Sequence, residues 1–214
     1  MTTDQVIHVV DDDRLFLAAL KRTLSVAGLE VRMYTGANAF LDSFDPQQPG
    51  CLITDLRMPG MGGLELQRRL KEMQVRLPII FITGHGNAST AVTALKCGAI
   101  DFLEKPFSEK DLMASVQLAL EKDLNDRRLA REQALVQQRF SNLSPREQQV
   151  FALVVSDLPN KKIARDLMIS PRTVEHHREH LMLKMHAHST AELITMAVLC
   201  GIHELHLCPP PLPG

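Results

Sequence analysis

The sequence predicts an α/β domain with a doubly wound, five-stranded parallel sheet, followed by a second, smaller domain made of helices alone. Two observations support this fold class. From residue 5 to about residue 124, short apolar runs alternate with helical patterns, which is typical of parallel strands joined by helices. From Ser144 onward the strand pattern ends, and one capped helix follows another.

The five predicted strands are short apolar runs, and the fourth is the most apolar of them. Strands that are apolar on both faces indicate a sheet covered by helices on both sides. The strands are expected at Val6–Val10, 29–34, 51–54, 79–82 and 99–103. The helices between them are expected at 15–27, 37–44, 63–73 and 89–97, and a fifth begins with a capping box at Ser108. Gly28 suits the position after the first helix, where glycine commonly ends helices.

The rest of the chain divides into a helical linker at 125–141, an all-helical domain at 142–205 and a proline-rich tail at 206–214. The first domain then covers 1–124. The linker is polar and free of Gly and Pro, and we interpret it as a solvated helix because it sustains no apolar heptad. A short coiled coil is the alternative. The tail cannot form helix or sheet ladders. Capping signals stand at Ser144, Ser170 and Ser189.

Composition excludes several classes of protein. The formal net charge is -1, so no global field draws the chain to nucleic acid. The four cysteines form no C-x-x-C pair, which indicates reduced thiols rather than a disulfide framework or a zinc ribbon. No apolar run approaches ~20 residues, and the N-terminus does not resemble a signal peptide. We therefore expect a cytoplasmic protein without a membrane partner.

Polar side chains follow four of the predicted strands at the point where each strand ends. Asp11 and Asp12 follow the first strand, Asp55 the third, Thr83 the fourth and Lys105 the fifth. Ligands of open parallel sheets bind at this edge. Carboxylates packed together need a cation, and hard oxygen ligands in small number suit Mg²⁺. Asp55 is then placed to attack a phosphoryl group and form an aspartyl phosphate, with Lys105 and Thr83 contacting the phosphoryl oxygens.

This constellation resembles the receiver domain of response regulators, over about residues 4 to 124. The matching residues are Asp11-Asp12, Asp55 within TDLRMPGMGG, Thr83-Gly84 and Lys105-Pro106-Phe107. The resemblance implies a flavodoxin-like fold and a sensor histidine kinase that phosphorylates Asp55. The bond between Lys105 and Pro106 is a candidate cis peptide.

The resemblance also implies roles for individual residues of the acidic site. The ligands of Mg²⁺ are expected to be Asp12, Asp55 and the backbone carbonyl of Arg57, with Asp11 supporting a metal-bound water. Phe102 matches the aromatic switch position, although a core residue is the alternative reading. Asp13 is better explained as a helix N-cap and is left out of the site.

The second domain resembles the LuxR-type helix-turn-helix over about residues 142 to 200. The matching stretches begin at Leu143, Asn160 and Ile169, and Lys184 and Ala191-Glu192-Leu193 continue the match. Together with the receiver and TGHG at 83–86, they indicate the FixJ branch of the NarL/FixJ regulators. The resemblance implies a transcription factor, usually an activator, that binds promoter DNA as a phosphorylated homodimer and works with RNA polymerase.

The helix expected at 171–185 has two distinct faces. Val174, Leu181 and Met185 form an apolar stripe with His177 between them, and the opposite face is polar and suits the major groove. By family position the base-facing residues are Glu175, His176 and Glu179. The candidate phosphate contacts are Lys161, Lys162, Arg172, Thr173, His177 and Lys184. The alternative is that the glutamates pair with Arg172 or Arg178. A zinc site at His176 and His180 lacks further ligands.

The same domain is rich in histidine. Seven of the chain's nine histidines lie in residues 142–208, where the formal charges of seven cations and seven anions cancel. We hypothesise that affinity for DNA rises as the pH falls from about 8 to about 6, since histidine ordinarily titrates near ~6.5. The alternative is that His177 packs inside and His203 and His206 lie in a tail that never meets DNA.

Dimerisation is expected through the helix at 89–97 and the fifth strand, with Val92, Leu95 and Leu103 as contacts unless they belong to the core. Two other functions compete with transcriptional control. One is an enzymatic effector domain, but the C-terminal half offers no nucleophile-base pair, phosphate loop or metal cluster. The other is a receiver that acts by protein contact alone. We expect a regulator rather than an enzyme.

Overall fold

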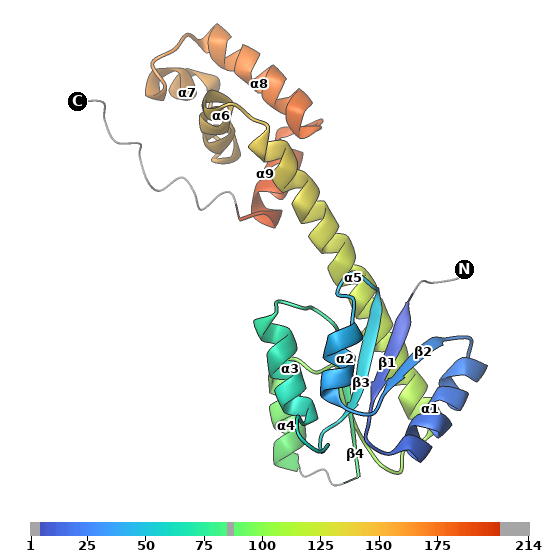
Figure 1. The fold of residues 1–214 in the computed structure, drawn as a ribbon. Coiled ribbons are helices and arrows are strands. Elements are labelled where there is room, and N and C mark those ends of the chain that lie inside the picture. Colours follow the sequence, from blue (N-terminus) through green and yellow to red (C-terminus); the bar gives the residue numbers. More distant parts are fainter. Residues whose placement is uncertain (1–4, 85–87, 202–214) are drawn as a thin grey trace. The chain divides into compact units, whose positions relative to one another are not determined.

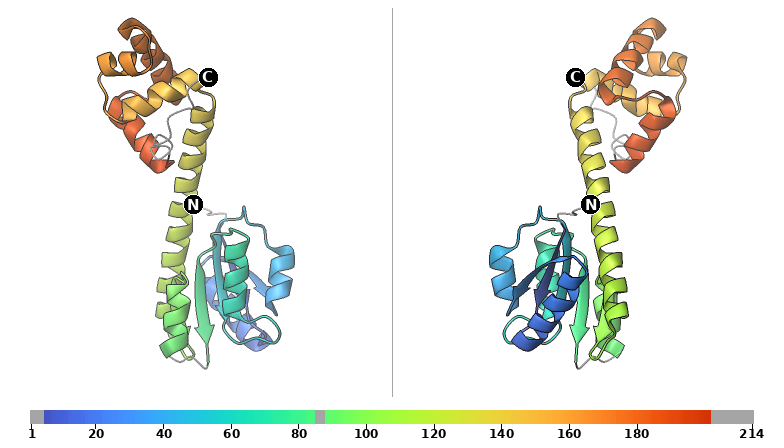
Figure 2. Two further views of the ribbon diagram at one scale, coloured as in Figure 1. Left: turned by 90° about the vertical axis from the view of Figure 1, so that its left-hand side faces the viewer. Right: turned by 90° about the vertical axis from the view of Figure 1, so that its right-hand side faces the viewer.

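The structure is a computed structural model that describes residues 5–84 and 88–201. It divides into two compact units, Met1–Arg127 and Arg128–Gly214. Helix α5, Glu109–Ser141, begins in the first unit and ends in the second, and Figures 1 and 2 show it as one uninterrupted helix.

The first unit contains a parallel sheet with the strand order β2-β1-β3-β4-β5. Its register pairs Val10 with Thr54 and Asp55 with Ile82, so the carboxyl ends of the strands lie at one edge. This is the order of doubly wound, flavodoxin-like sheets, and the predicted fold class is confirmed. The strands are β1 Val6–Val10, β2 Glu30–Tyr34, β3 Gly50–Asp55, β4 Ile79–Thr83 and β5 Asp101–Glu104.

Helices cover both faces of this sheet. Two separate cores result, one containing Leu24 of α1 and Leu112 of α5, the other Phe40 of α2 and Leu66 of α3. The first four helices are α1 Arg14–Val26, α2 Ala37–Ser43, α3 Gly63–Glu72 and α4 Ala88–Lys96. Gly28 follows α1 with φ +79°, as the sequence predicts.

The second unit consists of helices alone, as predicted. Helices α6 to α9 span Pro145–Val155, Asn160–Asp166, Pro171–Met185 and Thr190–Leu199. The predicted capping box at Ser144 is present, because Ser144 accepts from the Glu147 backbone while Glu147 accepts from the Ser144 backbone. Ser170 and Ser189 also cap their helices.

The linker prediction is correct in part. Residues 125–141 are helical, as expected, but they are not solvated throughout. Val136 and Phe140 are only 6% and 8% exposed and belong to the core of the second unit, together with Phe151 and Leu181. The aromatic rings of Phe140 and Phe151 meet edge to face. The C-terminal core therefore begins before the boundary expected at residue 142.

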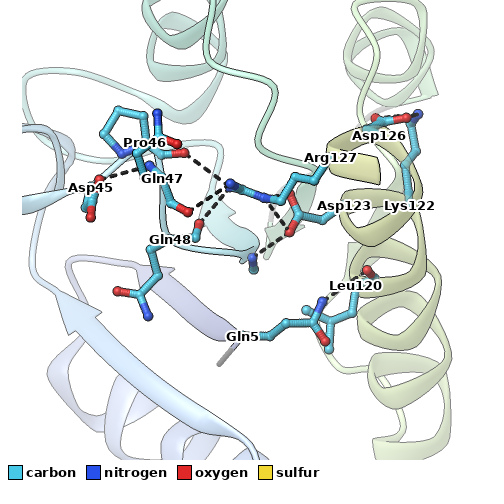
Figure 3. Close-up of polar contacts among 11 residues, drawn as sticks. Gln5, Asp45, Pro46, Gln47, Gln48, Leu120, Lys122, Asp123, Asp126 and Arg127 are labelled. Atoms are coloured by element: carbon cyan, nitrogen blue, oxygen red, sulfur yellow. Dashed lines mark hydrogen bonds and ion pairs between the residues drawn. The ribbon is translucent and has the colours of Figure 1, made fainter. Parts of the chain in front are cut away.

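A polar joint ties α5 to the loop between α2 and β3 (Figure 3). The carboxylate of Asp123 accepts from Arg127 at 2.8 Å and from the backbone N–H of Gly50 at 2.9 Å. The guanidinium of Arg127 donates in addition to the carbonyl oxygens of Pro46, Gln47 and Gln48. Asp123 is buried, and its charge is compensated by the hydrogen bonds that its carboxylate accepts from Arg127 and Gly50.

The first unit contains a buried histidine, His8. His8 on β1 is 1% exposed and packs against Phe40 and Phe44, with its Nδ1 3.1 Å from the hydroxyl of Tyr34. Within the described residues its Nε2 has no hydrogen-bond partner. Burial, and secondarily the charge of Arg32, lowers the pKa of His8 to about 4. The folded chain therefore keeps this ring neutral.

We expect the first unit to lose stability as the pH falls through the interval between the two pKa values of His8. The unfolded chain binds this proton below about 6.5, whereas the folded chain binds it only below about 4, so acid favours unfolding. Since one pKa unit corresponds to about 1.4 kcal/mol, the free energy of unfolding should fall by about 2 kcal/mol between pH 7 and pH 5 on this account.

Urea unfolding measures this loss through Tyr34, the only tyrosine in a chain without tryptophan. His8→Phe should flatten the pH dependence by about that amount, because phenylalanine cannot be protonated. Replacing the exposed His188 by Asn is the matched control. The expectation fails if His8→Phe and wild type lose the same free energy between the two pH values.

An acidic site and a candidate nucleic-acid interface

The structure brings the three aspartates at the strand ends together. Asp11 and Asp12 follow β1, and Asp55 is the last residue of β3. One carboxylate oxygen from each lies within 4.8 Å of the others. Asp11 is buried, Asp55 is partly buried and Asp12 is exposed, so the cluster opens to solvent on one side. The parallel register of β1 and β3 causes this juxtaposition, since it aligns the residues that follow Val10 and Thr54.

Lys105 lies beside the aspartates. Its Nζ is 2.8 Å from Oδ2 of Asp11 and 3.9 Å from Oδ2 of Asp55. The peptide bond between Lys105 and Pro106 is cis, as predicted from the sequence. Both oxygens of Asp11 have hydrogen-bond donors, because Oδ2 accepts from Lys105 and Oδ1 accepts from the backbone N–H of Asp13 at 2.8 Å. Asp12 and Asp55 have carboxylate oxygens left for another ligand.

Electrostatics at Asp55 favour an incoming cation. Burial raises the pKa of Asp55, and the negative charge of Asp11 raises it further. The backbone N–H groups of Arg57 and Leu56 and the ammonium of Lys105 act in the opposite direction. Three clustered carboxylates with one ammonium are short of positive charge. Their hard oxygen atoms, open to solvent, fit a magnesium ion that keeps several waters.

The remaining predicted residues of this edge are placed as follows. Thr83 ends β4 and is buried, and in the sheet it lies one residue beyond Ile82, the partner of Asp55. Phe102 on β5 is partly buried and packs against the core between the sheet and α2 and α3, which agrees with a core role and leaves the switch role untested. Asp13 caps α1 by accepting from Leu15 and Phe16, as expected for a residue outside the site.

The expected dimer contacts need one correction. Val92 and Leu95 of α4 are 49% and 46% exposed. Leu103, however, is buried in the core that includes Leu112 of α5, so the alternative that it is a core residue holds and it is no dimer contact. The alternation of side chains along β5 turns Leu103 to the face of the sheet that α1 and α5 cover.

Helix α8 has the two faces that the sequence predicts. Val174, Leu181 and Met185 are fully buried. The side chains of Arg172, Glu175, His176 and Glu179 are exposed, and His177 is partly buried between the two faces. Among the described residues, neither glutamate forms an ion pair with Arg172 or Arg178. The exposed side chains are therefore available to contact base edges in the major groove of DNA.

Two basic residues of α8 have structural partners that sequence reasoning missed. Lys184 donates to Glu147 at 2.7 Å, and Arg178 donates to Asn160 and Thr190. Burial alone would raise the pKa of Glu147, but hydrogen bonds from Lys184 and Ser144 hold it at about 2. The expected phosphate contact of Lys184 is thus weakened, since its ammonium serves to fix α8 against α6. The sequence predicts Glu147 as the glutamate of the capping box, at position N3, but it does not predict the ion pair with Lys184.

Lys161 and Lys162 of α7, and His176 and His180 of α8, lie on the surface of this unit. The hydroxyl oxygens of Thr173 and Ser170 are hydrogen-bonded to each other at 2.8 Å. The rings of His176 and His180 are 4.2 Å apart. Within the described ranges, the metal-ligand cluster found is that of the three aspartates and includes no histidine. His203 and His206 lie outside the described residues.

Comparisons with known proteins agree with both units. Residues 7–117 match the response regulator receiver domain, and residues 141–197 match the luxR family of bacterial regulatory proteins. The chain is 44% identical to the transcriptional regulatory protein FixJ of Azorhizobium caulinodans, with 92% of this chain and 93% of that protein covered. It is 42% identical to the response regulator protein TmoT of Ectopseudomonas mendocina, with 89% and 87% covered.

Solved structures give the same result. The response regulator StyR is 41% identical, with a TM-score of 0.80 over 91% of this chain and 98% of that one. Full-length FixJ from B. japonicum is 42% identical, with a TM-score of 0.57 over 94% and 99%. In the described part of the chain, no helix has the length and apolar character required to cross a membrane.

The matches to both domains and to full-length relatives show that the chain belongs to the FixJ-type response regulators. This is a family of DNA-binding transcriptional regulators rather than enzymes, in which a receiver domain is joined to a LuxR-type domain.

Proposed function

We propose that this regulator accepts a phosphoryl group on Asp55 from a sensor histidine kinase, and that this phosphorylation controls promoter binding through α8. The observation that carries the proposal is the meeting of Asp11, Asp12, Asp55 and Lys105 at one edge of the receiver sheet. An Asp55→Asn variant tests it, since phosphate uptake and phosphate-dependent promoter occupancy should both be lost.

The chemistry follows from the residues at this edge. A carboxylate oxygen of Asp55 attacks the phosphorus, the bond to the kinase histidine breaks, and the released imidazole takes up a proton. Asp12, Asp55 and the backbone carbonyl of Arg57 would hold Mg²⁺, which when bound supplies positive charge against the carboxylates and the phosphoryl oxygens. Lys105 donates to a phosphoryl oxygen, and the hydroxyl of Thr83 donates to another. Asp11 would hold a water molecule of that ion beside the site.

The DNA-binding unit presents α8 to the major groove. Glu175, His176 and Glu179 face base edges, because carboxylates accept from cytosine amino groups and imidazoles donate to guanine. Lys161, Lys162 and Arg172 contact phosphates from exposed positions, and Thr173 and His177 do so from partly buried ones. Lys184 is the least available of the predicted phosphate contacts, because it pairs with Glu147. We propose that the regulator activates transcription with RNA polymerase, and that it works in the cytoplasm, where promoter DNA lies. Phosphorylation favours a homodimer through Val92 and Leu95.

The two kinds of DNA contact should respond differently to substitution. Lys161→Ala should weaken binding to every sequence and lower the slope of log K against log salt by about one unit, since one phosphate contact is lost. His176→Ala and Glu179→Ala should instead relax the preference at one base pair per half-site, because these side chains meet base edges.

Fluorescence anisotropy on DNA fragments selected by the phosphorylated wild type from a random pool measures both effects. Lys21→Ala, an exposed lysine of the receiver, is the control and should change neither slope nor preference. If Lys161→Ala and Glu179→Ala give the same pattern, the assignment of the α8 face is incorrect.

A further inference from the structure

The ammonium of Lys105 rests on an aromatic ring. Its Nζ lies 3.5 Å from the ring centroid of Phe16, a partly buried residue in the first turn of α1. The ring of Phe107 meets Phe16 edge to face at 6.2 Å between centroids. Lys105 is thus held from two directions, by the carboxylate of Asp11 at 2.8 Å and by the face of Phe16. In this position its Nζ lies 3.9 Å from Oδ2 of Asp55.

An open groove beside the ring offers Lys105 another position. The groove has a volume of about 530 Å³ and lies between α1 and the start of α5. Phe16, Thr23 and Lys105 line it, and so does Glu109, whose carboxylate would attract an ammonium placed in the groove. The side chain of Lys105 is 24% exposed and carries four rotatable bonds, so confining it to the acidic edge has an entropic cost.

We propose that Phe16 is a positioning residue for phosphorylation, which keeps the ammonium of Lys105 at the strand ends, facing Asp11 and Asp55, rather than in the groove. This inference rests on the proposed function of Asp55 as acceptor. The negative face of an aromatic ring attracts a cation, whereas an aliphatic side chain of similar size only fills the space. The negative electrostatic potential of the ring face, and not the packing of Phe16, therefore keeps the ammonium of Lys105 at the strand ends.

The placement of Lys105 is tested first in the unphosphorylated full chain. In a spectrum of lysine labelled with ¹³C at Cε, the Hε protons of Lys105 should be shifted upfield by the ring current of Phe16, with the signal assigned by its loss in Lys105→Met. Phe16→Leu should abolish the shift and Phe16→Tyr should keep it. An unshifted Lys105 signal in the wild type would overturn the proposal.

The functional effect is measured as the rate of labelling by acetyl phosphate with Mg²⁺. Phe16→Leu should slow labelling roughly two- to tenfold, and Phe16→Tyr should restore it. In a Lys105→Met background the same Phe16→Leu change should have no further effect, since the ring acts only through Lys105. A loss of equal size in that background would show that Phe16 acts by packing, and the proposal would be wrong.

The two levels of failure are separable. If the wild type is labelled on Asp55 and Phe16→Leu is labelled equally fast, the role of Phe16 is refuted and the function of Asp55 stands. If the wild type is not labelled on Asp55, the proposed function fails, and the role of Phe16 in phosphorylation fails with it. Circular dichroism of each variant establishes that the compared chains are folded.

Discussion

Asp55→Asn is expected to take up no phosphate from acetyl phosphate, whereas the wild type becomes labelled in the presence of Mg²⁺. The amide of asparagine is not a nucleophile toward phosphorus, and its neutral side chain also weakens the cation site formed with Asp11 and Asp12. Labelling with ³²P measures the effect, because an aspartyl phosphate survives acid and is hydrolysed by base. Removing Mg²⁺ with EDTA should abolish labelling of the wild type as well.

Asp126→Asn is the matched control for this experiment. Asp126 is an aspartate of α5 that pairs with Lys122 at 2.9 Å, away from the strand-end aspartates, and its replacement should leave labelling unchanged. Sedimentation of the same samples should show self-association of the labelled wild type and of labelled Asp126→Asn, but not of Asp55→Asn. Persistent acid-stable label on Asp55→Asn would place the acceptor on another residue.

Asp123→Ala is expected to lower the free energy of unfolding of the receiver unit by about 3–5 kcal/mol. Asp123 is 1% exposed, and its removal leaves the guanidinium of Arg127 and the N–H of Gly50 without their carboxylate. The guanidinium of Arg127 is 21% exposed, so water replaces the missing anion only in part, and a largely buried charge without its partner is costly. The loss should appear in urea unfolding followed by the fluorescence of Tyr34.

Helix α5 contains a second ion pair, exposed to solvent, that serves as a control for the buried pair of Asp123 and Arg127. Lys122 and Asp126 are also four residues apart on α5, but their side chains are 51% and 29% exposed. Asp126→Ala should therefore cost less than about 1 kcal/mol, as exposed pairs do. Equal losses in Asp123→Ala and Asp126→Ala would mean that the joint with the α2–β3 loop contributes nothing to stability. Asp123→Asn should fall between them, since it keeps an acceptor for Gly50.

The sequence by itself determined the features that follow from short-range pattern. Apolar runs and helical periodicity placed the five strands and the buried stripe of α8, Val174, Leu181 and Met185. The acidic edge followed as well, because parallel strands put their carboxyl ends on one side, so Asp11 and Asp55 meet although 44 positions separate them in the chain. Local capping chemistry predicted Asp13 and Ser144 in the same way.

Only the tertiary structure decided which partner each long polar side chain takes and which linker residues are buried. Nothing in the sequence distinguishes Lys184 and Arg127 from other basic residues. Packing between elements that are distant in the chain places Lys184 beside Glu147 and Arg127 beside the α2–β3 loop. Packing in the second unit buries Val136 and Phe140 within a segment that is otherwise polar, and it is packing again that places Phe16 under Lys105. Periodicity describes a residue's own helix or strand, whereas these contacts depend on how separate elements meet, which no local pattern encodes.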